Sequence, residues 1–178
     1  AYDDLIQGAA AVPSLVSRAS GGEPRYVPLT LADRTVGLMA SNAILAAVIA
    51  RHQTGVGQAV EVPMFETMAQ YVLGEHMAGA SFEPALGETG YPRLLVKERR
   101  PYPTRDGHLC VLIYTDRHWE KFLDLIGQGT WFTQDPRFAN IGARTRHIND
   151  LYRLVAQAMA TQTTEEWTAR LNEADIPC

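Results

Sequence analysis

Cysteine is scarce in this 178-residue sequence, which contains only Cys110 and Cys178. Two cysteines make no disulfide framework, and their separation does not match the spacing of metal ligands, which fits a protein of the reducing cytoplasm. We expect Cys110 to be an inert core thiol, because its neighbours are apolar. Pairs of histidines at metal-ligand spacing are also missing, so we predict no metal site and surface or packing roles for His52, His76, His108, His118 and His147.

Runs of Lys and Arg are absent as well, and the formal net charge is −4. These features argue against a nucleic-acid or anionic-membrane surface and favour small molecules or protein chains as partners. The longest apolar stretch, residues 36–49, is interrupted by Gly37, Ser41 and Asn42 and is shorter than the roughly 18 to 20 residues that span a bilayer. We therefore predict a buried helix and no membrane partner. No signal peptide or initiator Met is recognised, which suggests a piece of a longer protein.

The known catalytic loops are mostly absent. The turn "TGVGQ", residues 54–58, lacks the Lys-Ser/Thr of a phosphate-binding loop and the glycine spacing of a dinucleotide site. No Gly-x-Ser-x-Gly nucleophile motif occurs. The sequence therefore gives no local signal for phosphate binding or for serine nucleophile chemistry.

Hydrophobic periodicity and breaker residues predict the order of elements. We predict a helix over residues 2–15, limited by Pro13, and a loop over 17–28. A helix over 34–52 follows, which should be buried because its residues 43–50 are apolar on every face. Further along we predict the following elements: a short strand at 58–63, a helix from Met64, a linker at 79–104, a buried strand at 108–114 after an Asp106-Gly107 turn, and helices at 117–126, 148–159 and from a capping box at Thr163 and Glu166. The helix, strand, helix order is of α/β type, and the second half resembles a small α+β domain.

Asp33, at the start of the predicted buried helix, has two interpretations. Asp is a favoured N-cap, so a purely structural role is the simpler one. The helix dipole also stabilises a carboxylate there by about 0.3 to 1 kcal/mol, which would suit a carboxylate nucleophile. Spacing alone does not decide between these roles.

The run "DRTVGLMASNAILAAVIARHQTGVGQAVEVPMFETMA", residues 33–69, resembles the class III CoA-transferases, also called the CaiB/BaiF family. The family carries Asp-x-x-x-Gly, an Ala-rich helix and Arg-x-x-Thr-Gly-x-Gly-Gln in this order. "YDDLIQGAA", "GYPRLLVKERRPYPTRDGHLCV" and "EWTARLNEADIPC" extend the resemblance over essentially the whole chain. It implies an α/β fold: residues 1–90 as the helix-rich remainder of a nucleotide-type large domain, and 91–178 as a small α+β domain.

The resemblance implies that Asp33 is the catalytic nucleophile of an acyl-CoA transferase. Coenzyme A would move from an acyl-CoA thioester to a carboxylic acid through an aspartyl intermediate, without metal, with Tyr2 and Asp3 near the substrate pocket. It further implies a cytoplasmic homodimer for the full-length protein and an inactive fragment. Two alternatives stay open. One is an α-methylacyl-CoA racemase, although Tyr2 stands where that subfamily has His, and the other is a non-catalytic binding or assembly module.

Overall fold

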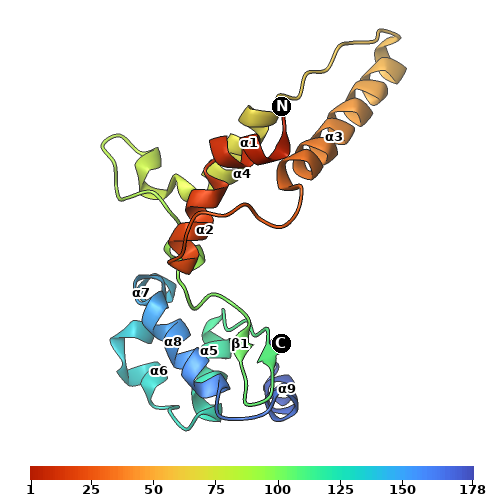
Figure 1. Ribbon diagram of the computed structural model, residues 1–178. Coiled ribbons are helices and arrows are strands. Elements are labelled where there is room, and N and C mark those ends of the chain that lie inside the picture. Colours follow the sequence, from red (N-terminus) through yellow and green to blue (C-terminus); the bar gives the residue numbers. More distant parts are fainter. The chain divides into compact units, whose positions relative to one another are not determined.

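A computed structural model describes all residues, 1–178, and divides them into two compact units, Ala1–Tyr91 and Pro92–Cys178 (Figure 1). The chain is rich in helix, with 59% of its residues helical. Its only sheet is a pair of strands of two residues each. The α/β alternation expected from the sequence is therefore not visible within this chain.

The first unit consists of helices α1 Asp3–Ala9, α2 Val12–Ser20, α3 Leu31–Thr54 and α4 Met64–His76, followed by the short 3-10 helix η1 Ala78–Ser81. The single helix predicted over residues 2–15 is in fact two helices, because Ala11 adopts the left-handed conformation with φ of 63°. Pro13 lies in the first turn of α2, where its missing N–H costs nothing, so it begins a helix and does not end one.

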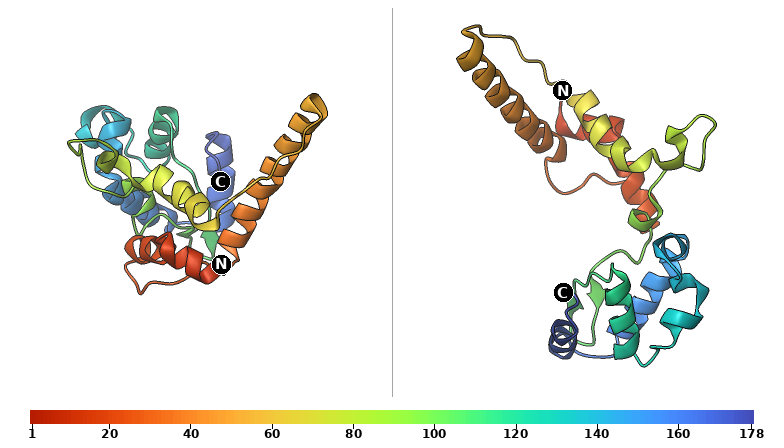
Figure 2. Two further views of the ribbon diagram at one scale, coloured as in Figure 1. Left: turned by 90° about the horizontal axis from the view of Figure 1, so that it is seen from above. Right: turned by 180° about the vertical axis from the view of Figure 1, so that it is seen from behind.

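The core of the first unit lies where α1, α2 and α4 meet the first turns of α3. Its buried apolar residues are Ile6, Ala10, Val12, Ala32, Val36, Met68 and Val72. The rest of α3 extends away from α1 and α4 (Figures 1 and 2), and Leu38 and Ile49 are 69% and 59% exposed. The prediction that this helix is buried is therefore wrong within this chain, because only its first two turns contribute to the core of this unit.

Helix α3 passes a test of length and composition for a helix that could cross a membrane, and 6% of its most apolar window is buried. The core helix of a soluble protein passes the same test, so this property alone is weak evidence for a membrane span.

The strand predicted at 58–63 is also wrong, since this segment is irregular and mostly exposed. A strand needs a neighbour to receive its backbone hydrogen bonds, and no other extended segment of the chain pairs with it. The alternating pattern of Ala59 to Val62 indicates which residues could face a core. It does not indicate whether a neighbouring strand is present.

The second unit is a helical cluster with a small hairpin. Its elements are η2 Pro92–Leu94, β1 Tyr102–Pro103, β2 His108–Leu109, α5 Asp116–Leu125, α6 Trp131–Gln134, η3 Pro136–Phe138, α7 Ile141–Arg146, α8 Ile148–Met159 and α9 Thr164–Glu173. The antiparallel strands are joined by the predicted Asp106-Gly107 turn, in which the Thr104 N–H donates to the Gly107 carbonyl at 2.9 Å. The predicted helices at 117–126 and 148–159 are confirmed as α5 and α8.

Aromatic rings from α5, η3 and α9 form the centre of this unit. The Trp119 and Phe138 ring centroids are 5.5 Å apart, and those of Phe122 and Trp167 are 6.3 Å apart. The Trp167 indole N–H donates to the Met159 carbonyl at 2.9 Å, so the buried ring leaves no polar atom unsatisfied. These contacts join the ends of α8 and α9 to α5.

The segment 108–114 departs from the prediction of a strand buried on both faces. Only His108 and Leu109 pair in a ladder, and burial alternates: Leu109, Val111 and Ile113 turn inward while the intervening residues are exposed. Cys110 is therefore exposed, and its predicted role as a core thiol is wrong. The run of apolar residues predicts burial on both faces, but only one face of segment 108–114 packs against the core of this unit.

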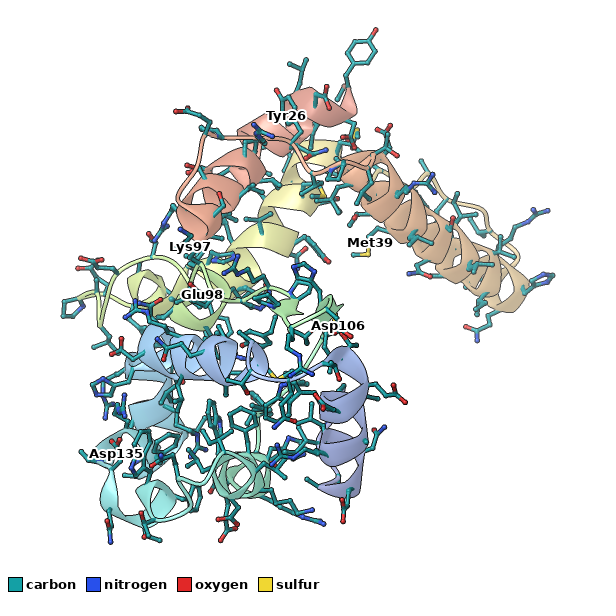
Figure 3. The ribbon with its side chains drawn as sticks, turned by 60° about the horizontal axis from the view of Figure 1, so that its bottom comes forward. Tyr26, Met39, Lys97, Glu98, Asp106 and Asp135 are labelled. Carbon is teal, nitrogen blue, oxygen red and sulfur yellow. The ribbon has the colours of Figure 1, made fainter.

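Helix α9 has the predicted capping box, with Thr163 Oγ1 accepting from the Glu166 N–H and the Glu166 carboxylate accepting from the Thr163 N–H. The turn residue Asp106 lies beside this helix start (Figure 3), and its Oδ1 accepts from the Thr164 N–H at 2.8 Å and from the Thr164 and Thr104 hydroxyls. Hydrogen bonds from Thr164 lower the pKa of the Asp106 carboxyl. The ionised Asp106 carboxylate therefore links the hairpin to α9 through hydrogen bonds.

We expect acid to weaken the link between the hairpin and α9. The folded pKa of Asp106 lies below its unfolded value of about 4, so its contribution to stability is present above that pH and is lost as the pH falls through the lowered folded pKa. The measurement is urea unfolding, followed by tryptophan fluorescence, at a series of acidic pH values. Asp106→Asn, which keeps the accepting oxygen, should make the loss of stability with acid shallower; identical slopes for the two proteins would contradict this assignment.

Candidate active site at the start of α3

Asp33 is the third residue of α3 and does not cap it. The N-cap is Thr30, which makes no side-chain cap hydrogen bond. The Asp33 side chain is exposed, and its carboxylate forms no hydrogen bond or ion pair with the rest of the chain. The capping interpretation of Asp33 is therefore wrong. Its carboxylate is accessible at the beginning of a 24-residue helix whose first turns are packed against the core.

The residue that does cap α3 is Asp3, on another helix. Asp3 Oδ1 accepts a hydrogen bond from the Asp33 backbone N–H at 3.0 Å, and Asp3 is only 9% exposed. Burial raises the pKa of the Asp3 carboxyl, but hydrogen bonds from the Asp33 N–H, the Gln7 amide and the Ala32 N–H outweigh burial and lower it. Asp3 is thus a buried anion held by neutral donors at the positive end of α3.

Gln7 holds Asp3 in place from one turn further along α1. It is completely buried, and its Nε2 donates to Asp3 Oδ2 at 2.5 Å and to the Leu29 carbonyl at 3.3 Å. Its Oε1 accepts from the Val27 N–H at 3.1 Å. Gln7 therefore ties α1 to the loop that enters α3, and no buried side-chain polar atom in the chain lacks a partner.

Tyr2 takes a different position from its neighbour. It is the N-cap residue of α1, with an extended backbone, and its side chain is 79% exposed. The structure thus brings Asp3 to Asp33 and leaves the ring of Tyr2 on the surface. Of the residues predicted near the substrate pocket, Tyr2 is accessible to a ligand, whereas Asp3 is turned inward.

The surface around Asp33 is unobstructed. Gly37 lies one helical turn further along the same side of α3, and a Cβ placed on it would meet no atom within 4 Å. A separate apolar groove of about 400 Å³ between α3 and α4 is lined by Thr35, Leu38, Met39, Thr67, Gln70 and Tyr71. At 100° per residue the α3 residues of this groove lie on the side opposite Asp33, so the groove and the carboxylate belong to different faces.

A family model for CoA-transferase family III matches residues 1–178. The chain belongs to this family. It is 26% identical to the probable fatty acyl-CoA transferase Rv3272 of Mycobacterium tuberculosis, over 94% of this chain and 45% of that protein. It is 31% identical to (R)-2-hydroxy-4-methylpentanoate CoA-transferase of Clostridioides difficile, over 88% of this chain and 39% of that protein.

Among solved structures, a CaiB/BaiF family protein from Brucella suis aligns with a TM-score of 0.66 at 25% identity, over 99% of this chain and 46% of that one. The helix-rich fold is therefore that of family III CoA-transferases. The chain spans less than half the length of the curated relatives it matches.

The family motif directed attention to Asp33, but sequence reasoning missed the hydrogen-bonding role of Asp3 and Gln7. A signal was present: they stand four residues apart, on the same side of α1 as the core residues Ile6 and Ala10. Two polar residues on a buried helix face must satisfy each other or a nearby backbone. Their partner, the start of α3, lies 30 residues away in sequence, which local patterns do not reveal.

Proposed function

We propose that the full-length protein moves CoA from an acyl-CoA thioester to a carboxylic acid through a covalent intermediate on Asp33. The observation that supports this most directly is the free, exposed Asp33 carboxylate at the fixed start of α3, inside the family motif. A carboxylate nucleophile needs no general base, and the site offers none in hydrogen-bond contact with it. We further propose that residues 1–91 belong to the large domain and residues 92–178 form the small one.

The reaction divides into two exchanges with balanced bonds. An Asp33 carboxylate oxygen attacks the thioester carbonyl carbon, the C–S bond breaks, and a mixed anhydride and CoA thiolate form. The thiolate then attacks Cγ of Asp33 and expels the donor acid, which leaves an aspartyl-CoA thioester. The acceptor carboxylate attacks that carbonyl and releases thiolate, which finally attacks the acceptor's carbonyl carbon and frees Asp33.

Each tetrahedral step needs donors for a developing oxyanion. Two of the first backbone N–H groups of α3 are already engaged: the Leu31 N–H donates to the Leu29 carbonyl, and the Asp33 N–H donates to Asp3. These two groups are therefore not free to stabilise the oxyanion. In our proposal those donors come from other parts of the full-length protein, and the open space beside Gly37 leaves room for the acyl group.

The test is to trap the intermediate. The full-length protein is incubated with a panel of acyl-CoA thioesters, quenched with hydroxylamine and digested with trypsin. Cleavage after Arg25 and Arg34 releases the peptide Tyr26–Arg34, in which Asp33 is the only acidic side chain, so a hydroxamate on this peptide identifies the site without ambiguity. We expect modification only when acyl-CoA is present.

The same experiment separates the alternatives. A racemase would exchange the α-proton of its acyl-CoA with solvent and leave the Tyr26–Arg34 peptide unmodified. A non-catalytic module would give neither signal, even if CoA bound to it. Either outcome, obtained across the panel, would overturn the proposed transferase mechanism.

A further inference from the structure

We propose that Asp3 is a positioning residue for the Asp33 nucleophile: by capping α3 in place of Asp33, it leaves the Asp33 carboxylate free to react. This inference rests on the proposed function. Asp3 and its partner Gln7 would affect the rate of the chemical step without contacting the substrate.

Asp3 competes with Asp33 for the backbone donors at the start of α3. An Asp side chain in the first turn of a helix tends to bond to the unpaired N–H groups there, which satisfies both partners. A carboxylate held in that way would have its lone pairs and direction fixed toward the helix. In this structure the Asp33 N–H donates to Asp3 at 3.0 Å, so this donor is not available to the Asp33 carboxylate.

The backbone of Asp33 is held at 3.0 Å by a carboxylate that is itself buried and fixed by Gln7, and Gln7 bonds in turn to Val27 and Leu29 of the entry loop. Buried and partly buried hydrogen bonds therefore fix the backbone of Asp33, although its side chain lies on the surface. Such a supporting shell fixes reacting groups, and a displacement of about 1 Å can cost about 100-fold in rate.

Both Asp3 oxygens accept, and Gln7 donates to Asp3 through Nε2 while accepting from Val27 through Oε1. No cation faces this pair through a hydrogen bond or ion pair, so the arrangement depends on which atom donates and which accepts. Asp3→Asn keeps an oxygen for the Asp33 N–H but turns an amide N–H toward the Gln7 amide. Exchanging both residues, Asp3→Asn with Gln7→Glu, restores a donor opposite an acceptor between these two side chains, but it removes the Nε2 donor of the Leu29 carbonyl.

The experiment measures CoA transfer and the single-turnover rate of Asp33 modification by acyl-CoA in the full-length protein. We expect Asp3→Asn to lower both kcat and the modification rate by about 10- to 100-fold per folded molecule, with KM changed less than about threefold, because ground-state binding is not touched. The double variant Asp3→Asn/Gln7→Glu should be faster than Asp3→Asn and slower than the wild type, because the Leu29 carbonyl still lacks its donor. Asp4→Asn, the same change at the exposed neighbour in the same helical turn, is the matched control and should leave both rates unchanged.

Circular dichroism gives the folded fraction, by which each rate is divided. Wild-type rates in Asp3→Asn, or a double variant no faster than the single one, would overturn the positioning role, as would a loss that disappears after correction for folding. Failure of this proposal is distinguishable from failure of the proposed function. The latter is shown by wild-type protein that forms no Asp33 adduct, whereas the former needs an adduct that forms equally well in Asp3→Asn.

Discussion

Replacement of Asp33 by Asn will reduce CoA transfer by the full-length protein by at least about 1,000-fold, because removal of a covalent nucleophile leaves only binding and orientation to accelerate the reaction. The amide has neither the charge nor the available lone pair with which the carboxylate attacks a thioester. Asp33→Ala should give a loss of the same order, because it removes the same atoms. The measurement is steady-state transfer between the acyl-CoA and acid pair that gives the strongest wild-type signal.

The fold should tolerate this change. The Asp33 side chain is exposed and bonds to nothing in the chain, and the cap on α3 comes from Asp3, so the expected loss of stability is below about 1 kcal/mol, mainly from the helix dipole. Asp4→Asn, in the first turn of α1, serves as the control for removal of an exposed acidic group and should retain full activity. Transfer by Asp33→Asn within threefold of wild type would rule out the covalent role.

Features set by nearby residues were predictable from the sequence. The capping box at Thr163 and Glu166 and the apolar stripe of α8 both involve residues a few positions apart, and the structure has both. Hydrogen bonds and helix periodicity act over this short range. The same reasoning located the Asp106-Gly107 turn, which forms the hairpin between β1 and β2.

The failures have a common physical cause, namely partners that are distant in sequence or that this chain does not supply. Residues 58–63 have the alternation of a strand but no neighbouring strand, and α3 has an apolar surface with few packing partners. Local sequence favours Asp33 as its own helix cap, although Asp3 provides the cap from 30 positions away. A sequence pattern indicates which side chains a segment can bury and which hydrogen bonds it can donate. The partners of those side chains and donors depend on tertiary contacts.

In the second unit, a single buried side chain, that of Leu151, should contribute strongly to the free energy of unfolding. Leu151, in the middle of α8, is completely buried in the cluster that includes Trp119, Phe122 and Trp167. Leu151→Ala removes apolar contacts and leaves a cavity, so we expect the free energy of unfolding to fall by about 2 to 5 kcal/mol. Because the protein interior is close-packed, neighbouring rings fixed by their own contacts fill such a space only in part.

Leu112→Ala is the matched control for this prediction, since the same atoms are removed from a side chain that is 46% exposed. Its effect should stay within about 0.5 kcal/mol, because the backbone hydrogen bond from Leu112 N–H to the Pro177 carbonyl does not involve the side chain. Tryptophan fluorescence during urea unfolding reports on this unit alone, as Trp119, Trp131 and Trp167 all lie within residues 92–178. Equal losses for the two leucine variants would mean that the α8 cluster is not the stabilising core of the unit, and that burial of Leu151 adds nothing beyond what an exposed leucine contributes.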